Sequence, residues 1–390
     1  MKTSNQNNIL TIFLDGRIDS GNAEEKEKEL NAHISNNSFE NLVLDIDELE
    51  YISSAGLRMV LRTRKNFPSL KIINASSEVY EILDMTGFTE MITVEKAYRK
   101  LSVDGCKIIG KGAKGTVYRY DADTIVKVYK NADSLPEIKN ERELARKAFV
   151  LGIPTAIPYD VVKVGNCFGS VFELLDAKSY STLIAENPEK FDNYVSLYAE
   201  LLRTIHSTNV KKGELTDFKL TARKWVDAAS PYLKTEDADK LSKMLNSIPD
   251  TLNIIHCDCH TNNIMMQNDE TLLIDMDTLS QGHPIFELAN IHITYVGFGE
   301  QDSAIVENFL GLPYDIAIKI WNAFLPLYLE TQDEDRIKEV EDKVKVLSYT
   351  RLIRHMLKRG ATDTEDGRRI VGIYSDKINK LLESVDSLDF

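Results

Sequence analysis

The sequence predicts an α+β protein with two parts, a small α/β domain followed by a larger two-lobed domain. Strand and helix signals alternate through the first hundred residues, as they do where helices cover a largely buried sheet. Signals for successive antiparallel strands begin at Cys106, and the chain is mostly helical beyond Ser179. We therefore expect domains over residues 1–100 and 101–390, the second with a strand-rich lobe of about 103–176 and a helix-rich lobe of about 177–390.

The first domain is predicted from short apolar runs separated by amphipathic segments. Strands are expected where aliphatic and β-branched residues cluster, at Ile9–Phe13, Leu42–Ile46 and Leu70–Ile73. Helices are expected where apolar residues recur at helical spacing, at Ala23–Ile34, Gly56–Arg64 and Ser76–Met85. Asp15-Gly16 is typical of a turn, and the polar segment Glu95–Asp104 is expected to be a linker.

The second domain begins with strands and continues with helices. The strands are expected at Lys107–Ile109, Val117–Tyr120 and Thr124–Tyr129, with two more within Asn166–Leu174. The helices are expected at Leu135–Leu151, Phe191–His206, Lys219–Ala229, Thr235–Asn246, Pro313–Tyr328 and Asp333–Leu357.

The composition limits the kinds of partner. The 390 residues include 61 acidic and 47 basic side chains, for a formal net charge of −14. A surface of this charge repels nucleic acid and anionic membranes, so we expect neither as a partner. We see no signal peptide and no apolar stretch long enough for a membrane span. Four cysteines are too few for a disulfide framework, which favours a cytoplasmic location.

A glycine-rich motif opens the second domain. Gly110, Gly112 and Gly115 form the pattern G-x-G-x-x-G-x-V with Val117. Glycines let backbone N–H groups approach phosphate oxygens without obstruction by side chains. The same glycines could instead mark a dinucleotide fold or only a hairpin. Because Val117 continues into a strand, where the dinucleotide motif would open a helix, we favour a loop over the phosphates of a bound nucleotide.

A lysine in the next predicted strand fits the same chemistry. Lys127 interrupts the apolar run T-I-V-K-V-Y. Alone it would most simply be an outward-facing lysine, but the upstream loop favours a lysine that positions the α- and β-phosphates. Such a lysine needs an acidic partner. We choose Glu141 on the following helix, with Glu143 as the alternative, because one sequence does not fix the phase of a helix.

The strongest chemical signal is the run H-C-D-C-H-T-N-N at residues 256–263. Asp258 can orient or accept the proton of an attacking hydroxyl, and Asn263 can bind a magnesium ion. Asp275 ends the apolar segment Leu272–Ile274, and its carboxylate would bind a magnesium ion that bridges phosphates. The predicted catalytic residues are therefore Asp258, Asn263 and Asp275, and the predicted metal ligands are Asn263 and Asp275.

Two other interpretations of this run exist. The cysteines and histidines could hold zinc, but alternation on a strand divides them between two faces and no C-x-x-C or distant His pair completes a site. A structural interpretation places His256 in the core and lets Asp258 cap a turn. It would make the ordered set of loop, lysine, H-x-D-x-x-x-x-N and downstream aspartate a coincidence. We therefore favour phosphoryl transfer.

These motifs, in this order, resemble the aminoglycoside phosphotransferase and choline kinase branch of the protein-kinase-like fold. H-C-D-C-H-T-N-N is similar to its H-G-D-x-H-x-x-N, where His260 stands in place of a protein kinase's lysine. Ile274-Asp275, Gly282-His283-Pro284 and Glu287-Leu288-Ala289 are similar to its I-D…G-x-P…D-L-A run. The resemblance covers about residues 105–390. It implies a bilobal fold, ATP and Mg²⁺ as cofactors, and transfer of a phosphoryl group to a hydroxyl of a small molecule.

The resemblance also assigns further residues. It makes Glu141 the helix glutamate, and Glu173 and Leu175 part of the F-E-L-L segment that hydrogen-bonds adenine. Two positions depart from the branch, since Cys257 replaces the usual glycine and Glu287 an aspartate. Helical segments 180–250 and 290–390 should build the acceptor pocket. Acidic residues such as Glu287, Asp302 and Glu307 could favour a cationic amine or aminoglycoside there, or could be solvated surface charges.

The first hundred residues resemble a STAS domain, the fold of bacterial anti-sigma factor antagonists. D-G-R-I-D at Asp15–Asp19, the run Leu42–Asp47 and Y-I-S-S-A-G-L-R at Tyr51–Arg58 follow its pattern. In antagonists the helix-opening D-S-[ST]-G carries a serine that a partner kinase phosphorylates, and Ser54 occupies that place. The alternative is that Ser53 and Ser54 only cap the helix. The serine that replaces the motif's aspartate at position 53 slightly favours this alternative.

Two functions follow from these features. The first is an ATP- and Mg²⁺-dependent phosphotransferase acting on a small-molecule hydroxyl, with a STAS domain for regulation. The second is a signalling protein whose STAS domain docks an anti-sigma or sensor protein, while the kinase-like unit senses nucleotide or phosphorylates Ser54. We favour the first, because His260 is typical of the small-molecule branch.

Overall fold

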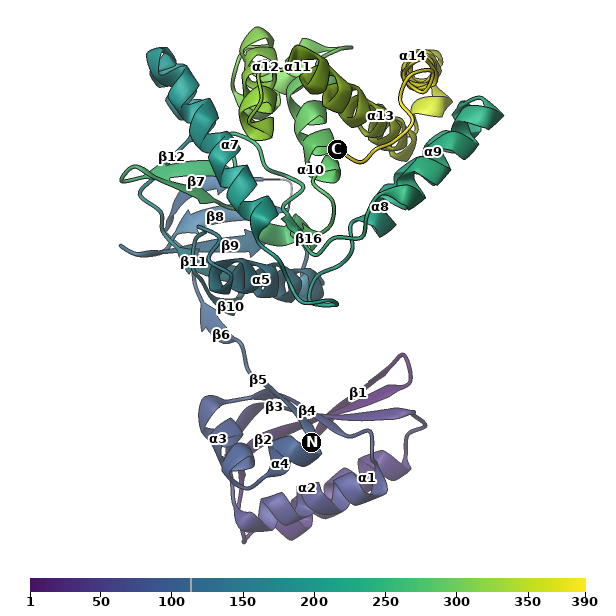
Figure 1. The fold of residues 1–390 in the computed structure, drawn as a ribbon. Helices are drawn as coiled ribbons and strands as arrows, with labels where there is room; N and C mark the ends of the chain where they lie inside the picture. Colours follow the sequence, from purple (N-terminus) through teal and green to yellow (C-terminus); the bar gives the residue numbers. More distant parts are fainter. Residues whose placement is uncertain (113) are drawn as a thin grey trace. The chain divides into compact units, whose positions relative to one another are not determined.

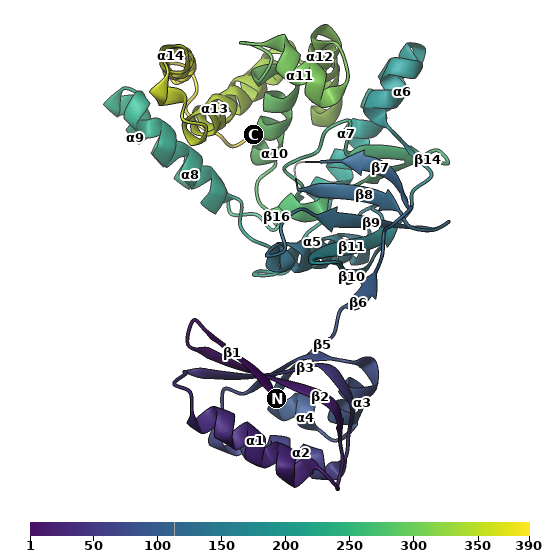
Figure 2. The same ribbon diagram turned by 180° about the vertical axis from the view of Figure 1, so that it is seen from behind.

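The protein is described by a computed structural model that covers residues 1–112 and 114–390. It divides into two compact units, which Figures 1 and 2 draw from opposite sides. Unit 1 comprises residues 1–102 with 162–165, and unit 2 comprises residues 103–161 with 166–390. Ala113, a variable position of the glycine-rich motif, lies outside the described residues.

Unit 1 is a five-stranded sheet flanked by helices. Its strand order is β1-β2-β3-β4-β5, with β1 antiparallel to β2 and the other neighbours parallel. The strands are β1 (Lys2–Gln6), β2 (Ile9–Ile18), β3 (Asn41–Ile52), β4 (Lys71–Ala75) and β5 (Thr93–Lys96). The helices are α1 (Ala23–Ser35), α2 (Ser54–Asn66), α3 (Ser77–Met85) and α4 (Phe88–Met91). Parallel strands alternating with helices give the α/β domain that the sequence predicts.

One local prediction for unit 1 is wrong. Asp15-Gly16 is no turn but lies inside β2, where the pairing with β3 shifts register on either side of it and Gly16 adopts a φ of 65°. A glycine permits this left-handed irregularity without breaking the strand. The expected linker Glu95–Asp104 contains the division between the units, after Ser102. It also contains the end of β5 and a further strand, β6 (Arg99–Leu101), which pairs with Val162–Val164.

Close packing holds the start of α2 against the sheet. The Ser53 hydroxyl caps this helix by accepting a hydrogen bond from the Gly56 N–H at 3.5 Å. A Cβ added at Gly56 would lie 2.7 Å from Cγ1 of Ile52 and 2.8 Å from Cγ2 of Ile18. Only glycine lets the helix lie this close to the ends of β2 and β3.

The first half of unit 2 is an antiparallel sheet with one long helix. Next to β6, which is parallel to β10, the strands continue in the order β10-β11-β9-β8-β7. They are β7 (Lys107–Lys111), β8 (Gly115–Arg119), β9 (Thr124–Tyr129), β10 (Pro158–Val164) and β11 (Cys167–Glu173), with helix α5 (Leu135–Val150) between β9 and β10. The sequence predicted two strands within Asn166–Leu174, but the structure has only β11 there, and its hairpin partner β10 precedes it. The α+β class itself is confirmed.

The second half of unit 2 is helical, with short strand pairs near its start. The helices are α6 (Tyr180–Glu186), α7 (Phe191–Ser207), α8 (Lys219–Ala229), α9 (Thr235–Ser247), α10 (Ile285–His292), α11 (Ser303–Leu310), α12 (Tyr314–Leu329), α13 (Glu334–Lys358) and α14 (Glu365–Leu381). The strands are β12 (Lys178–Ser179), β13 (Ile254–Ile255), β14 (Ile264–Gln267), β15 (Glu270–Leu273) and β16 (Ser280–Gln281). In Figures 1 and 2, α10 runs from β16 into the helices α11 to α13. All eight residues of α10 are buried, so this helix forms the centre of the lobe. Among the described helices, none is both long and apolar enough to cross a bilayer.

Candidate active site

Three of the predicted site residues from distant parts of the chain meet in unit 2. Lys127 on β9 lies 2.8 Å from Oε1 of Glu141 on α5 and 3.2 Å from Oδ1 of Asp275, which follows β15. Glu141 is buried, and its other oxygen accepts a hydrogen bond from the Tyr129 hydroxyl. Burial alone would lower the pKa of Lys127, but the carboxylates of Asp275 and Glu141 outweigh it and raise that pKa. The lysine is therefore a fixed positive charge.

The structure also separates the two candidate partners of Lys127. Glu143 is half-buried and pairs with its neighbours Arg142 and Arg146, while Glu141 faces β9. Helix phase decides between them, because residues two apart on a helix point to different sides.

The three motif glycines meet different surroundings. A Cβ at Gly115 would lie 2.3 Å from the backbone oxygen of Val128, so the pairing of β8 with β9 requires glycine there. A Cβ at Gly110 or Gly112 would meet nothing closer than 3.6 Å. The fold itself therefore leaves room at these two positions, and a phosphate group could approach the backbone there.

Acidic oxygens gather beside this loop. Carboxylate oxygens of Glu141, Asp275 and Asp277 lie within 4.8 Å of one another. Asp277 also forms an ion pair with Lys114 of the glycine-rich loop. Sequence reasoning missed Asp277 as a site residue, although its spacing of two from Asp275 was a visible signal. Among the described residues this is the only such group, and it contains neither Cys257 nor Cys259. The zinc alternative gains no support from it.

Asp258 lies in the segment of residues 256–263, which we call the catalytic loop after its predicted role. Its Oδ1 is 3.7 Å from Nε2 of His260, and its Oδ2 is 3.4 Å from Nδ2 of Asn263. Burial would raise the pKa of Asp258, but the hydrogen bond and charge of His260 outweigh it, so the pKa is lowered. Nδ2 of Asn263 also donates to the backbone oxygen of Asp258 at 3.0 Å. Its amide oxygen is therefore the end that could bind a cation.

The catalytic loop and Asp275 are directly linked. Nδ1 of His256 accepts from the Asp258 N–H at 3.3 Å, so Nε2 carries the proton and donates to the backbone oxygen of Asp275 at 3.0 Å. Cys257 and Asp275 both adopt a φ of 66°, in the left-handed region. Glycine suits this conformation, which explains why a glycine is usual at the place of Cys257.

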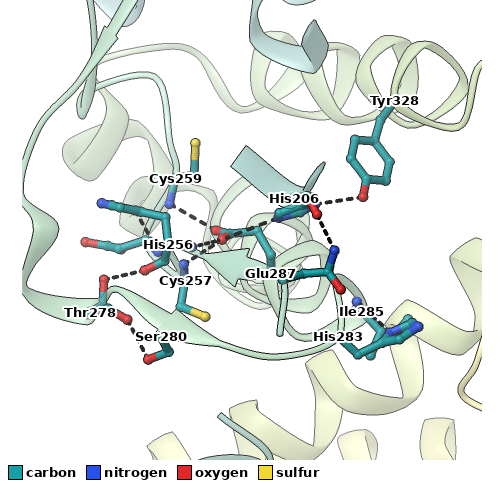
Figure 3. A network of polar contacts seen from close by, with 12 residues as sticks. His206, His256, Cys257, Cys259, Thr278, Ser280, His283, Ile285, Glu287 and Tyr328 are labelled. Carbon is teal, nitrogen blue, oxygen red and sulfur yellow. Dashed lines mark hydrogen bonds and ion pairs between the residues drawn. The ribbon is translucent and has the colours of Figure 1, made fainter. Parts of the chain in front are cut away.

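Glu287 on α10 holds the backbone of the loop, as Figure 3 shows. Its carboxylate has no exposed surface and accepts from the N–H groups of His256, Cys257 (2.7 Å) and Cys259 (3.4 Å). Burial would raise the pKa of Glu287, but its contacts with His206, His256 and the backbone donors outweigh it and lower that pKa. The glutamate thus supports the loop in place of the usual aspartate, and it does not face an acceptor.

Two buried tyrosines complete the support of the loop. The Tyr198 hydroxyl of α7 donates to the backbone oxygen of Cys259 at 2.5 Å, and the Tyr295 hydroxyl accepts from the Thr261 N–H at 2.8 Å. Tyr295 lies in a π-helical turn, Ile293–Gly297, that extends α10. Such turns are frequent at functional sites. No sequence signal marked either tyrosine.

The remaining predicted residues lie apart from this cluster. Glu173 ends β11, and its carboxylate accepts from the Ile157 N–H at 3.2 Å. Leu175 follows in a segment without regular structure. Ser54 is the first residue of α2 in unit 1 and is exposed. Asp302 caps α11 through the Ala304 N–H at 3.1 Å, and Glu307 is exposed.

Comparison with known proteins divides the chain at the same region. The model of the phosphotransferase enzyme family (APH) matches residues 105–313, and the STAS domain model matches residues 1–101. A putative anti-sigma factor antagonist, BtrV, of Bordetella bronchiseptica is 34% identical over 90 residues, which is 22% of this chain and 77% of that protein.

Solved structures of kinase-type phosphotransferases are also similar. A choline/ethanolamine kinase family protein from Mesorhizobium loti has a TM-score of 0.47 and 15% identity, covering 72% of this chain and 88% of its own. An ADP-bound aminoglycoside phosphotransferase, APH(2'')-Ib, has a TM-score of 0.48 and 14% identity, covering 77% of this chain and 98% of its own.

Proposed function

This chain belongs to the phosphotransferase enzyme family and carries a STAS domain, and we propose that it transfers the γ-phosphoryl group of ATP to a hydroxyl of a small molecule. The observation that carries the proposal is the convergence of Lys127, Glu141 and Asp275. Three segments of the chain bring one fixed cation and two carboxylates together beside a glycine-rich loop. Phosphoryl transfer depends on such positioning and charge stabilisation.

The nucleotide would lie between the glycine-rich loop and β11. Gly110 and Gly112 have no side chain to obstruct phosphate oxygens, although the Gly112 N–H donates to the Gly115 oxygen at 2.9 Å. Lys127 would bind the α- and β-phosphates. At the other end, the backbone of Glu173 and Leu175 would hydrogen-bond adenine. Among the loop and turn hydrogen bonds of the described residues, none uses the Leu175 N–H, so this donor is available to a ligand.

The donor atoms of the site suit Mg²⁺. All the side chains of the acidic group offer oxygen, which hard cations prefer, and none offers sulfur or nitrogen. Asp275 and the amide oxygen of Asn263 would hold the ion, with Asp277 close enough to assist. When bound, Mg²⁺ would neutralise charge on the phosphates of ATP.

Asp258 would orient the hydroxyl of the acceptor. Its lowered pKa keeps the carboxylate ionised at neutral pH, so it can accept a hydrogen bond from the attacking hydroxyl and orient it. Asn263 holds the side chain and the backbone oxygen of Asp258 from one side. Glu287 holds the loop by accepting hydrogen bonds from its backbone N–H groups.

The test is ATP consumption by the purified full chain with Mg²⁺, against a panel of amino sugars and choline-like alcohols. We expect turnover with at least one hydroxyl compound and a loss of at least about 1,000-fold in Asp275→Ala and in Asp258→Asn. A matched control is Asp269→Asn, an exposed carboxylate on the turn between β14 and β15. Turnover that survives in Asp258→Asn would remove this residue from the mechanism.

A second function has an observation in its favour. Ser54 is exposed at the N-terminus of α2, and the first turn of this helix contains no acidic residue. A phosphate on Ser54 would meet the positive end of the helix dipole without repulsion from a neighbouring carboxylate. The unit could then dock an anti-sigma or sensor protein, with the kinase-like unit as nucleotide sensor or as the kinase for Ser54.

Mass spectrometry separates these roles of unit 1. The full chain is incubated with Mg²⁺ and ATP, with Ser54→Ala and Asp258→Asn as matched variants. Phosphate on Ser54 that both variants lose would favour phosphorylation by this chain, and an unmodified Ser54 would favour simple capping. We also propose the boundary near residue 101 and a cytoplasmic location, the latter because all four cysteines are free thiols.

A further inference from the structure

An exposed apolar strip lies on α11. Ile305 and Phe309 are four residues apart, so they share one face of the helix. They are 47% and 49% exposed, while Val306 and Leu310, about 100° further around the helix, are buried in the core. Together they form a small apolar surface, whose significance depends on what lies next to it.

This strip is joined to the catalytic loop by two contacts. The Phe309 ring packs edge-on against the His260 ring, with 4.8 Å between centroids. The Asn262 side chain donates to the backbone oxygen of Phe309 at 2.7 Å. Since His260 lies 3.7 Å from Asp258, the Phe309 ring is only one side chain away from the proposed base. The apolar strip therefore begins next to the place that the proposed function gives to the acceptor hydroxyl.

His260 adds a second observation at this place. It is 4% exposed, and its Nδ1 has no hydrogen-bond partner in the described part of the chain. The His260 imidazole therefore lies between the Asp258 carboxylate, which is polar, and the Phe309 ring, which is apolar. A ligand bound here would place its hydroxyl next to Asp258 and its carbon atoms next to Phe309.

The acidic residues of this region do not line the strip. Glu287 has no exposed surface and is used by the loop backbone. Glu307 is two positions from both Ile305 and Phe309, hence roughly 160–200° around the helix from them. Asp302 lies at the N-terminus of α11, where its carboxylate caps the Ala304 N–H. Recognition of a polycation would need carboxylates on the strip, and α11 offers none there.

We infer that the acceptor is an alcohol whose hydroxyl lies next to an apolar alkyl or aryl group, and that Phe309 is the residue that selects it. This inference rests on the proposed function and narrows its substrate class away from aminoglycosides. Burial of a ring against Phe309 and Ile305 would favour such an acceptor over its unsubstituted analogue by about tenfold.

Matched probes test the inference on the full chain. Ethanolamine and 2-amino-1-phenylethanol share a hydroxyl and an amine and differ by one phenyl ring, and kanamycin serves as the polycation. Binding is measured by ligand-observed NMR in the presence of Mg²⁺ and ATP, and phosphorylation is followed in the same samples. Phe309→Ala is the test variant. It keeps the backbone oxygen that binds Asn262, so the loop contact survives. Leu220→Ala removes an exposed apolar side chain of α8, 64% exposed, and is the control.

We expect the phenyl probe to bind about tenfold more tightly than ethanolamine, a preference lost in Phe309→Ala and kept in Leu220→Ala. Equal binding of the two amines, tighter binding of kanamycin, or a preference that survives in Phe309→Ala would each overturn the inference. The same experiment distinguishes failure of this inference from failure of the proposed function. If the preference depends on Phe309 but no probe in the panel is phosphorylated, the apolar site stands and phosphoryl transfer does not. If a probe is phosphorylated but the phenyl probe is not preferred, phosphoryl transfer stands and the apolar site does not.

Discussion

The two units hold their candidate functional turns by different means. In unit 1 the turn at Ser53-Ser54 is held by shape, because Gly56 lets α2 contact Ile18 and Ile52. In unit 2 the turn that carries Asp258 is held by buried polar groups, with Glu287, Tyr198 and Tyr295 bonded to its backbone. A turn held by packing tolerates changes of charge and pH, whereas one held by a buried carboxylate depends on both. A substitution in one unit should therefore change the stability of that unit and leave the other unchanged.

Glu287→Ala should have the largest effect. It leaves three buried N–H groups of the catalytic loop without an acceptor, which costs about 3–5 kcal/mol. Hydrogen exchange should rise in peptides that cover residues 253–264 and stay unchanged in residues 1–101, and ATP turnover should be lost. Glu287→Asp, which keeps the carboxylate, should lose much less. Equal effects of the two substitutions would show that packing and not charge holds the loop.

Gly56→Ala should act on unit 1 alone. The added methyl group overlaps Ile18 and Ile52, and such overpacking costs about 1–3 kcal/mol. Exchange should rise in residues 10–66 while phosphorylation of the acceptor is retained. Gly372→Ala, at a helical position of α14 with nothing within 4 Å of the new Cβ, is the matched control and should be neutral or stabilising. A faster-exchanging catalytic loop in Gly56→Ala would contradict the separation.

His292 should make unit 2 sensitive to acid. It is fully buried, and burial, with the charges of Lys345 and Lys377, lowers its pKa from 6.5 to about 3. A histidine that stays neutral when folded takes up a proton on unfolding, so its contribution is complete above pH 6.5 and is lost progressively below it. The loss between pH 7 and pH 5 is about 1–2 kcal/mol. His292→Phe should flatten the pH dependence of urea unfolding of unit 2. An unchanged pH slope would assign the acid sensitivity to other groups.

Cys257→Gly should have the smallest effect. Glycine relieves a left-handed conformation that costs about 1 kcal/mol, but it gives up the packing of a buried thiol of similar value. We expect a change in unfolding free energy below about 1 kcal/mol. Cys257→Val, β-branched at the same φ of 66°, should be clearly less stable. Equal stabilities of the two variants would mean that the backbone relaxes at this position.

The motifs were readable from the sequence because each chemical residue lies in a local pattern. The glycine loop, Lys127, H-x-D-x-x-x-x-N and Asp275 follow one another in order, and the alternation of strands and helices in unit 1 gave its class. The choice of Glu141 over Glu143 needed the helix phase, which only the contact with β9 supplies. Helix α10 was not predicted, since its residues are buried all round and no amphipathic period marks it.

Other parts of the site depend on long-range packing. Tyr198 and Tyr295 lie 61 and 34 residues from the loop groups they bind, and nothing in their local sequence distinguishes them from core aromatics. The role of Glu287 was doubtful from sequence because a longer side chain replaces the usual aspartate. The three-dimensional structure shows that the extra methylene is accommodated. The sequence left open whether Glu287 favours a cationic acceptor or is a solvated surface charge. The structure supports neither for this residue, because its side chain is fully buried against the loop backbone.

Calorimetric titration of the full chain with ATP, with and without Mg²⁺, tests the central claim most directly. The account predicts binding that is strengthened at least tenfold by Mg²⁺ in the native chain, and a Mg²⁺ effect that Asp275→Asn abolishes while the chain stays folded. ATP binding that is indifferent to Mg²⁺, or equal in the native chain and Asp275→Asn, would contradict the assignment of this cluster as a phosphoryl-transfer site.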